Sequence, residues 1–150
     1  MLKIFIDGDA CPVKDEVARV AARHSVQVFL VSNQGMRRAM GPLVQGILVG
    51  PAFDAADNWI VEHIVVNDIV ITSDIQLASR CLAKAAQAIN PTGKIFTDEN
   101  MGAALAMREL SAYLREAGEI KGGNAPFSKH DRSNFLQALD LVIQKNIKKL

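Results

Sequence analysis

The stretch that decides the fold lies near the N-terminus and reads Ile4-Phe5-Ile6-Asp7-Gly8-Asp9-Ala10-Cys11-Pro12-Val13-Lys14-Asp15-Glu16. An apolar run ends in two aspartates, Asp7 and Asp9, which a single glycine separates. A proline follows where the first turn of a helix begins, and the acids after it suit the positive end of a helix. The stretch therefore predicts a buried strand over residues 3–7, a tight turn and a helix over residues 12–24.

The same alternation of apolar runs and amphipathic segments continues along the chain. Further strands are predicted at 26–31, 47–49, 68–72 and 94–96. Strands that alternate with helices are typical of a parallel sheet. We expect a three-layer α/β fold with a mostly parallel five-stranded sheet and helices on both faces. Residues 1–150 are expected to form one domain, with a Gly/Pro loop at 118–128 before a C-terminal helix at about 131–147.

Length, composition and charge narrow the function classes. The chain has 150 residues, of which 49% are hydrophobic, as expected for one globular domain. Its formal net charge of +1 gives no overall attraction to a polyanion, so a nucleic-acid contact would need a local basic patch. No apolar run approaches the ~20 residues that span a bilayer, and no signal peptide is visible. We therefore expect a cytoplasmic protein without a membrane segment.

Acidic residues follow nearly every predicted strand. In parallel sheets, ligands bind outside the carboxyl ends of the strands, so these acids are expected along one edge. Converging carboxylates repel one another unless a cation neutralises them, and Mg²⁺ or Mn²⁺ prefers such oxygen ligands. A metal held there could activate water for attack on a phosphodiester. The sequence thus predicts a divalent-metal site from acids at these strand ends: Asp7, Asp9, Asp54, Asp57, Asp74, Asp98 and Glu99.

Helix capping is the alternative explanation for several of these acids. Asp54 and Asp57 have the spacing of an N-cap with a reciprocal acid, and Asp74 is placed as an N-cap, a role that stabilises a helix by about 1 kcal/mol. Asp98 and Glu99 occupy a first turn, where acids are favourable in any case. Asp7 is harder to explain in this way, because an ionised group at the end of a buried strand needs compensation.

Hydroxyl and basic residues near the same strand ends are candidate phosphate contacts. Ser32, Arg37 and Arg38 follow the second strand, and Ser73 precedes Asp74. A second group lies where the last helix is expected to begin. The free backbone N–H groups at the start of a helix favour anions. That group comprises Ser128, Lys129 and Arg132. An ordinary solvated surface remains the alternative for both basic clusters.

Four blocks of the sequence resemble the bacterial YaiI/YqxD family of uncharacterised proteins. They are Asp-Gly-Asp-Ala-Cys-Pro-Val-Lys (7–14), Ala-Ala-Asp-Asn-Trp-Ile (55–60), Asp-Ile-Val-Ile-Thr-Ser-Asp-Ile-Gln-Leu-Ala (68–78) and Pro-Phe-Ser-Lys-His-Asp-Arg (126–132). The resemblance covers essentially the whole chain. It implies a relation to PIN and NYN domains, which are metal-dependent ribonucleases with a parallel-sheet core.

This resemblance assigns roles to individual acids. It implies that Asp7, Asp57 and Asp74 are metal ligands, with Asp54 as the substitute for Asp57. Asp9 would be an accessory catalytic acid, although its place two residues after Asp7 departs from the usual PIN pattern. The implied cofactor is Mg²⁺ or Mn²⁺, and the implied substrate is RNA.

Two other functions stay open. One is a haloacid-dehalogenase-like phosphatase, in which Asp7 and Asp9 would be nucleophile and acid/base and Ser32 would bind phosphate. Against it, position 11 is Cys rather than Thr or Val, and no second acid follows Asp74 within three or four residues. The other is a non-catalytic RNA-binding domain that retains the fold, since fold alone does not fix function. A row of acids argues against it, because acids repel RNA unless a metal is bound.

Overall fold

The protein is described here from a computed structural model, which covers residues 2–8, 11–34, 40–52, 54–102, 106–107 and 127–148. One six-stranded sheet has the order β3-β2-β1-β4-β5-β6. Its strands are β1 (Lys3–Asp7), β2 (Gln27–Ser32), β3 (Val44–Leu48), β4 (Ile69–Ile71), β5 (Gln87–Ile89) and β6 (Ile95–Phe96). Neighbouring strands from β3 to β5 pair in parallel, and β6 pairs antiparallel with β5.

The α/β class and the mostly parallel sheet are confirmed, but the predicted number of five strands is wrong. The additional strand is β5, which follows a stretch that the sequence assigns to a helix. Because β6 runs antiparallel to β5, residues after it leave the sheet at its opposite edge. The expectation that Asp98 and Glu99 lie with the other acids is therefore wrong. The third strand, predicted at 47–49, spans Val44–Leu48.

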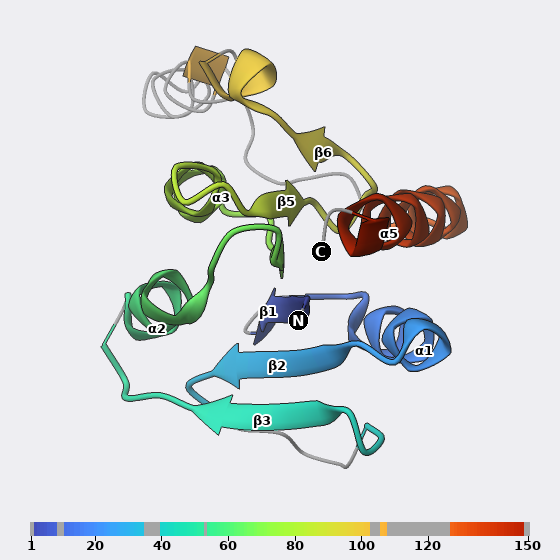
Figure 1. Cartoon of the computed structure of the whole chain (residues 1–150). Helices are drawn as coiled ribbons and strands as arrows, with labels where there is room; N and C mark the ends of the chain where they lie inside the picture. The colour runs from blue at the N-terminus through green and yellow to red at the C-terminus, as the bar shows by residue number, and fades with distance from the viewer. Residues whose placement is uncertain are drawn as a thin grey trace.

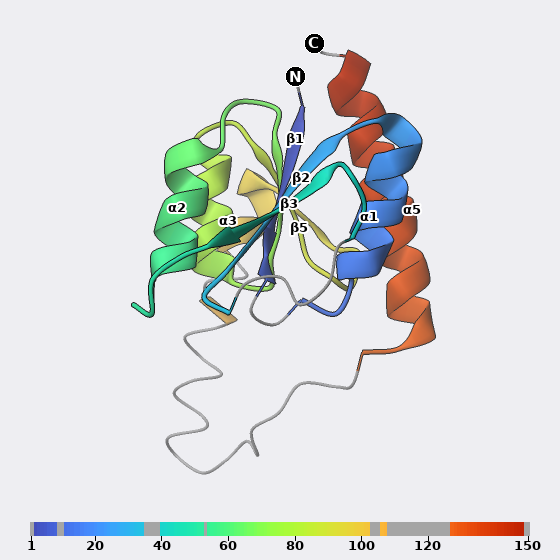
Figure 2. The same cartoon turned by 90° about the horizontal axis from the view of Figure 1, so that it is seen from below.

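Helices cover both faces of the sheet (Figure 1). Figure 2 shows α1 (Lys14–His24) and α5 (Lys129–Lys148) side by side on one face, with α2 (Ala55–His63) and α3 (Ile75–Leu82) on the other. The predicted last helix at about 131–147 thus begins slightly earlier, at Lys129. Most of the predicted loop at 118–128 lies outside the described residues. Within the described part of the chain, no helix is long and apolar enough to cross a membrane.

Each face of the sheet has its own apolar core. Ile4 and Ile6 of β1 contribute to the core beneath α1 and α5, whereas Phe5 contributes to the core beneath α2 and α3. This alternation follows from the two-residue side-chain period of a strand. With both faces covered, β1 reads as a continuous apolar run, as the opening stretch predicted.

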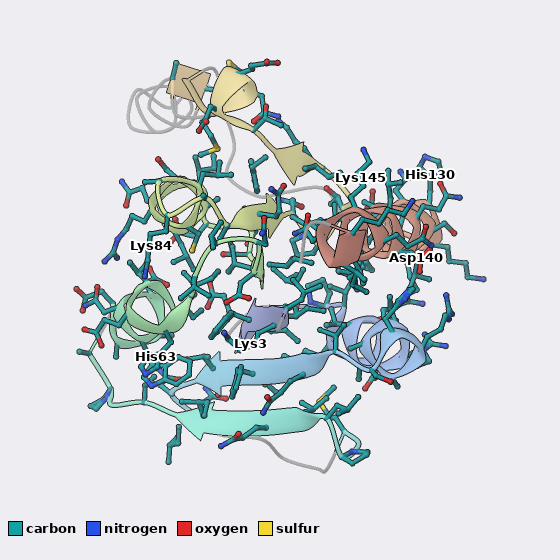
Figure 3. All side chains as sticks on the ribbon, in the orientation of Figure 1. Lys3, His63, Lys84, His130, Asp140 and Lys145 are labelled. Atoms are coloured by element: carbon teal, nitrogen blue, oxygen red, sulfur yellow. The ribbon has the colours of Figure 1, made fainter. Side chains whose placement is uncertain are left out.

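Polar side chains tie the helices to each other and to the sheet (Figure 3). Asp140 of α5 lies toward α1, where its Oδ1 is 2.6 Å from His24 Nε2. Lys84, after α3, reaches across to α2 and donates to the carbonyl oxygen of Val61. Lys3 Nζ is 3.2 Å from the buried carboxylate of Asp68, which joins the starts of β1 and β4. These contacts fix the layers that position the carboxyl ends of the strands.

Candidate functional site

The strand order places two predicted site residues at a topological switch point. From β1 the chain proceeds outward to β2 and β3 on one side, then returns to β4 and β5 on the other. In open α/β sheets, ligands bind outside the carboxyl ends of strands where the order reverses in this way. Asp7 ends β1, and Asp74 follows β4, the neighbouring strand across the switch. The parallel pairing of β1 with β4 therefore brings these two segments to neighbouring positions at one edge of the sheet.

The Thr72 hydroxyl links the two segments directly. It donates a hydrogen bond to Asp7 Oδ2 at 3.0 Å and accepts one from the backbone N–H of Asp74, also at 3.0 Å. Thr72 is only 2% exposed, so these bonds are shielded from water. Because the Thr72 oxygen accepts the bond from the Asp74 N–H, the hydroxyl hydrogen is left to point at Asp7. The sequence places Thr72 at a strand end beside the expected site, but it does not predict that its hydroxyl orients Asp7.

Capping accounts for part of the predicted acidic set. Asp74 is the N-cap of α3, and its Oδ1 accepts from the backbone N–H groups of Gln76 at 2.9 Å and Leu77 at 3.4 Å. Both bonds use one carboxylate oxygen. Asp54 is the N-cap of α2 by position, but its side chain makes no capping hydrogen bond. The capping explanation is confirmed for Asp74, and the capping bond expected of Asp54 is not formed.

Asp57 lies in the first turn of α2 and is half-buried. Burial raises the pKa of its carboxyl to about 6, and the negative charges of Asp7 and Asp74 add to this shift. The positive charge of Arg80 lowers the pKa of Asp57, and the negative charge of Asp54 adds a smaller increase. Arg80, on α3, is held near α2 by a hydrogen bond from Nη2 to Asn58 Oδ1 at 3.1 Å. The carboxylates of Asp7 and Asp74 therefore lie close enough to Asp57 for their charges to disfavour its ionisation.

Other buried acids in the described chain are compensated by protein cations. Asp68, 1% exposed, has Lys3 Nζ at 3.2 Å and accepts from two backbone N–H groups. Glu16, 6% exposed, has Arg132 Nε at 3.1 Å and Arg19 Nη2 at 3.7 Å. Such partners are what a buried charge needs. At Asp57, by contrast, the net effect of the surroundings favours the neutral carboxyl.

The described acids at this edge have the donor atoms that a divalent cation prefers, but they are not arranged as a complete metal site. Within the described ranges, no group of three or more His, Cys, Asp or Glu side chains is arranged to hold a metal ion. The acids nearest the switch point supply only carboxylate oxygens, which match Mg²⁺ and Mn²⁺. A cation there would relieve the repulsion that raises the pKa of Asp57.

Ser32 ends β2 beside the Asp7 turn and is 5% exposed. Its Oγ accepts from the backbone N–H of Gln34 at 3.3 Å. A Cβ at Gly8 would lie 2.7 Å from Leu30 Cδ1 and 3.0 Å from the Val31 carbonyl oxygen, so glycine lets the chain after Asp7 approach β2 without crowding it. Ser73, between Thr72 and Asp74, is exposed. Both serines lie at the predicted edge, and their phosphate-binding role stays a prediction.

The predicted phosphate cluster at the start of α5 takes part in helix capping and in an ion pair. Ser128 and Asp131 form reciprocal bonds, with Asp131 N–H donating to Ser128 Oγ at 3.1 Å and Ser128 N–H donating to Asp131 Oδ2 at 3.0 Å. Arg132 pairs with Glu16 and lies 5.7 Å from the Phe127 ring centroid. Lys129 is exposed. The cluster belongs to the α1/α5 face, whereas Asp57 and Asp74 belong to the opposite helical layer.

Three predicted site residues, Asp9, Arg37 and Arg38, lie outside the described residues, so their roles stay predictions. Cys11, next to the Asp7 turn, is described. Burial raises the pKa of its thiol to about 11, which keeps it neutral near pH 7. A neutral thiol is a poor nucleophile, which argues against a nucleophilic role for Cys11.

Comparison with known proteins identifies relatives over nearly the entire chain. Residues 5–145 match a family model described as "Uncharacterized BCR, YaiI/YqxD family". A UPF0178 protein of Agrobacterium fabrum is 53% identical over 138 residues, covering 92% of this chain and 90% of the relative. UPF0178 proteins of Rhizobium etli and Rhodospirillum centenum are 50% and 54% identical, each over 95% of this chain and over 92% and 96% of the relatives. No solved structure matches the chain.

Proposed function

We propose that this chain, which belongs to the YaiI/YqxD family of uncharacterised bacterial proteins, is a divalent-metal-dependent nuclease that hydrolyses RNA phosphodiester bonds. The observation that carries the proposal is the meeting of Asp7 and Asp74 at the switch point, with Asp57 close enough to feel both charges. The strand order from β3 to β5 suits the PIN-like architecture that the sequence resemblance implies.

Each of the three acids is supported by a different element. Asp7 is oriented by the Thr72 hydroxyl, and Asp74 is fixed by its capping bonds to α3. Asp57 approaches from α2, on the helical layer that also contains α3. These residues would hold Mg²⁺ or Mn²⁺, which supplies a Lewis acid for the phosphodiester and neutralises the carboxylates. Asp9 would be the accessory acid.

Residues around this edge would orient the substrate. Ser32 and Ser73 offer hydroxyl groups beside the strand ends, and Lys129 offers an exposed cation at the start of α5. Arg132 is partly engaged by Glu16, so it would contact a phosphate only along its exposed side. Arg37 and Arg38 complete the expected set. Such contacts position a nucleic acid without reading its sequence.

Thermal unfolding with and without Mn²⁺ tests the metal site. At a cation concentration about 100 times Kd, binding adds about 2.7 kcal/mol to the free energy of unfolding, which raises Tm by about 5–10 °C. Asp7→Asn should abolish both this increase and the cleavage of a single-stranded RNA. Glu62→Gln, an exposed change on α2, is the matched control and should leave both intact. No increase in Tm at millimolar Mn²⁺ would refute the metal site.

Trapping of a covalent intermediate separates the nuclease from the phosphatase alternative. The phosphatase hypothesis requires a covalent phosphoryl group on Asp7 during turnover of a phosphomonoester. Trapping phospho-aspartate at Asp7 would therefore replace the nuclease proposal, whereas RNA cleavage without such an intermediate supports it.

A further inference from the structure

The outer strand β3 presents an edge without the usual protection. Among the described residues, β3 pairs with β2 alone and ends the sheet. Natural edge strands are usually short, charged or interrupted by proline. The opposite edge strand, β6, has only two residues, whereas β3 has five. Residues 42–52 contain no charged side chain, and their two prolines, Pro42 and Pro51, lie outside the strand.

The hydrogen bonds to β2 show which backbone groups of β3 point outward. The Leu43 carbonyl accepts from Val28 N–H at 2.8 Å, and Val49 N–H donates to the Ser32 carbonyl at 3.0 Å. Odd-numbered residues of this segment therefore direct their N–H and C=O groups toward β2. Because the direction alternates along a strand, Gly46 and Leu48 direct theirs outward. The Val44 carbonyl also points outward, whereas the Val44 N–H donates to the Gly41 carbonyl at 3.3 Å.

The side chains along this edge are apolar and incompletely covered. Leu48 is 70% exposed, the highest exposure given for any large apolar side chain in the described chain. Val44 packs against the core beneath α1, and alternation places Leu48 on that same face of the sheet. Such an exposed leucine, beside backbone groups that no described strand pairs, indicates a surface that another strand covers.

We propose that β3 pairs antiparallel with β3 of a second copy of this chain, about a two-fold axis at Gly46. In this register Gly46 faces Gly46 of the partner subunit, and each Val44 faces the other copy's Leu48. Gly46 then exchanges both backbone hydrogen bonds with its own copy, and each Leu48 N–H donates to the Val44 carbonyl of the other copy. The exposed Leu48 side chain gains a cross-strand apolar neighbour in Val44.

Self-complementarity favours a second copy over an unrelated peptide. A two-fold interface requires that one surface match itself, and the uncharged segment 42–52 brings no like charges together when it meets its own copy. The symmetric register pairs the outward N–H groups of Gly46 and Leu48 on both strands at once. Antiparallel pairing directs the carboxyl edges of the two sheets toward opposite ends of the dimer. The dimer therefore does not depend on the proposed nuclease activity.

Sedimentation equilibrium of the full chain at micromolar concentration tests the dimer. The expected mass is twice the chain mass of 16.3 kDa. Leu48→Lys should weaken dimerisation roughly tenfold or more, since it removes both Leu48–Val44 pairs and adds a charge to the edge. Gly46→Pro removes an outward N–H while leaving the bonds to β2 intact, so it should give a folded monomer. Circular dichroism checks that each variant is folded.

Leu141→Lys is the matched control, because Leu141 is 47% exposed on α5 and away from β3. It should leave the dimer unchanged. Amide exchange gives a second measure, in which protection of Gly46 N–H should rise with protein concentration. A wild type that stays at the monomer mass refutes the proposal. Protection of the Gly46 N–H that does not change with protein concentration also refutes it, because another segment of the same chain would then cover the edge. A dimer that survives both edge variants refutes it as well.

Discussion

Replacing Thr72 by valine isolates the hydroxyl group that orients Asp7 while keeping the shape of the side chain. Thr72 is 2% exposed, donates to Asp7 Oδ2 and accepts from the Asp74 N–H, both at 3.0 Å. A hydrogen bond to a charged group contributes about 1.5–3 kcal/mol, and a buried N–H left without its acceptor costs about 1–3 kcal/mol. Because the new methyl group offsets part of this loss, we expect Thr72→Val to lower the free energy of unfolding by about 2–3 kcal/mol.

The same change should weaken metal binding through Asp7. Residues that orient a metal ligand typically change affinity by about 10- to 100-fold when they are removed. Urea unfolding measures the stability, and calorimetric titration with Mn²⁺ measures the affinity. Thr72→Ser is the control, since it keeps the hydroxyl group and loses one methyl group. If Thr72→Val binds Mn²⁺ as tightly as the wild type, the hydroxyl does not position a metal ligand, and this reasoning is wrong.

Three other predictions follow from individual contacts. The carboxyl of Asp57 should titrate near pH 6 by NMR and shift toward its usual value of 3.8 in Asp74→Asn. Since its folded-state pKa is the higher one, its contribution to stability should fall as pH rises from 3.8 to about 6, and an unshifted titration would contradict this. Arg132→Ala should lower the free energy of unfolding by about 1–2 kcal/mol, because buried Glu16 then keeps only the longer contact to Arg19. An unchanged denaturant midpoint would contradict this pairing. Gly93→Ala should lower the free energy of unfolding by about 2–4 kcal/mol, because φ is +97° and the new Cβ would lie 2.6 Å from the Asn134 backbone. Gly41→Ala, with φ of +110° and open space around it, should lower it by only about 1 kcal/mol, and equal losses would contradict the packing argument.

The sequence predicts most of this fold because its apolar runs and caps are regular, and its failure at β5 has a specific cause. The segment after α3 reads Ala83-Lys84-Ala85-Ala86, which has high helix propensity and contains no glycine. The chain nevertheless leaves the helix at Leu82, and Ala85 takes a positive φ of 63°, a conformation that usually requires glycine. The strand that follows has three residues, too few to display an alternating pattern. Because the sequence does not predict β5, it also does not predict that residues 90–93 form the hairpin that reverses β6.

The candidate site was predictable in part, because strand ends can be located from the sequence but charge compensation cannot. Asp68 and Asp57 both lie near predicted strand or helix ends, and nothing local distinguishes them. The structure pairs Asp68 with Lys3, which is 65 residues away in the sequence, whereas Asp57 is left with Asp7 and Asp74 as neighbouring charges. An acid that the fold neutralises is explained by stability alone. Acids that the fold brings together against their own repulsion are not explained by such pairing, and this is why the switch point, rather than any single aspartate, supports the proposed cation site.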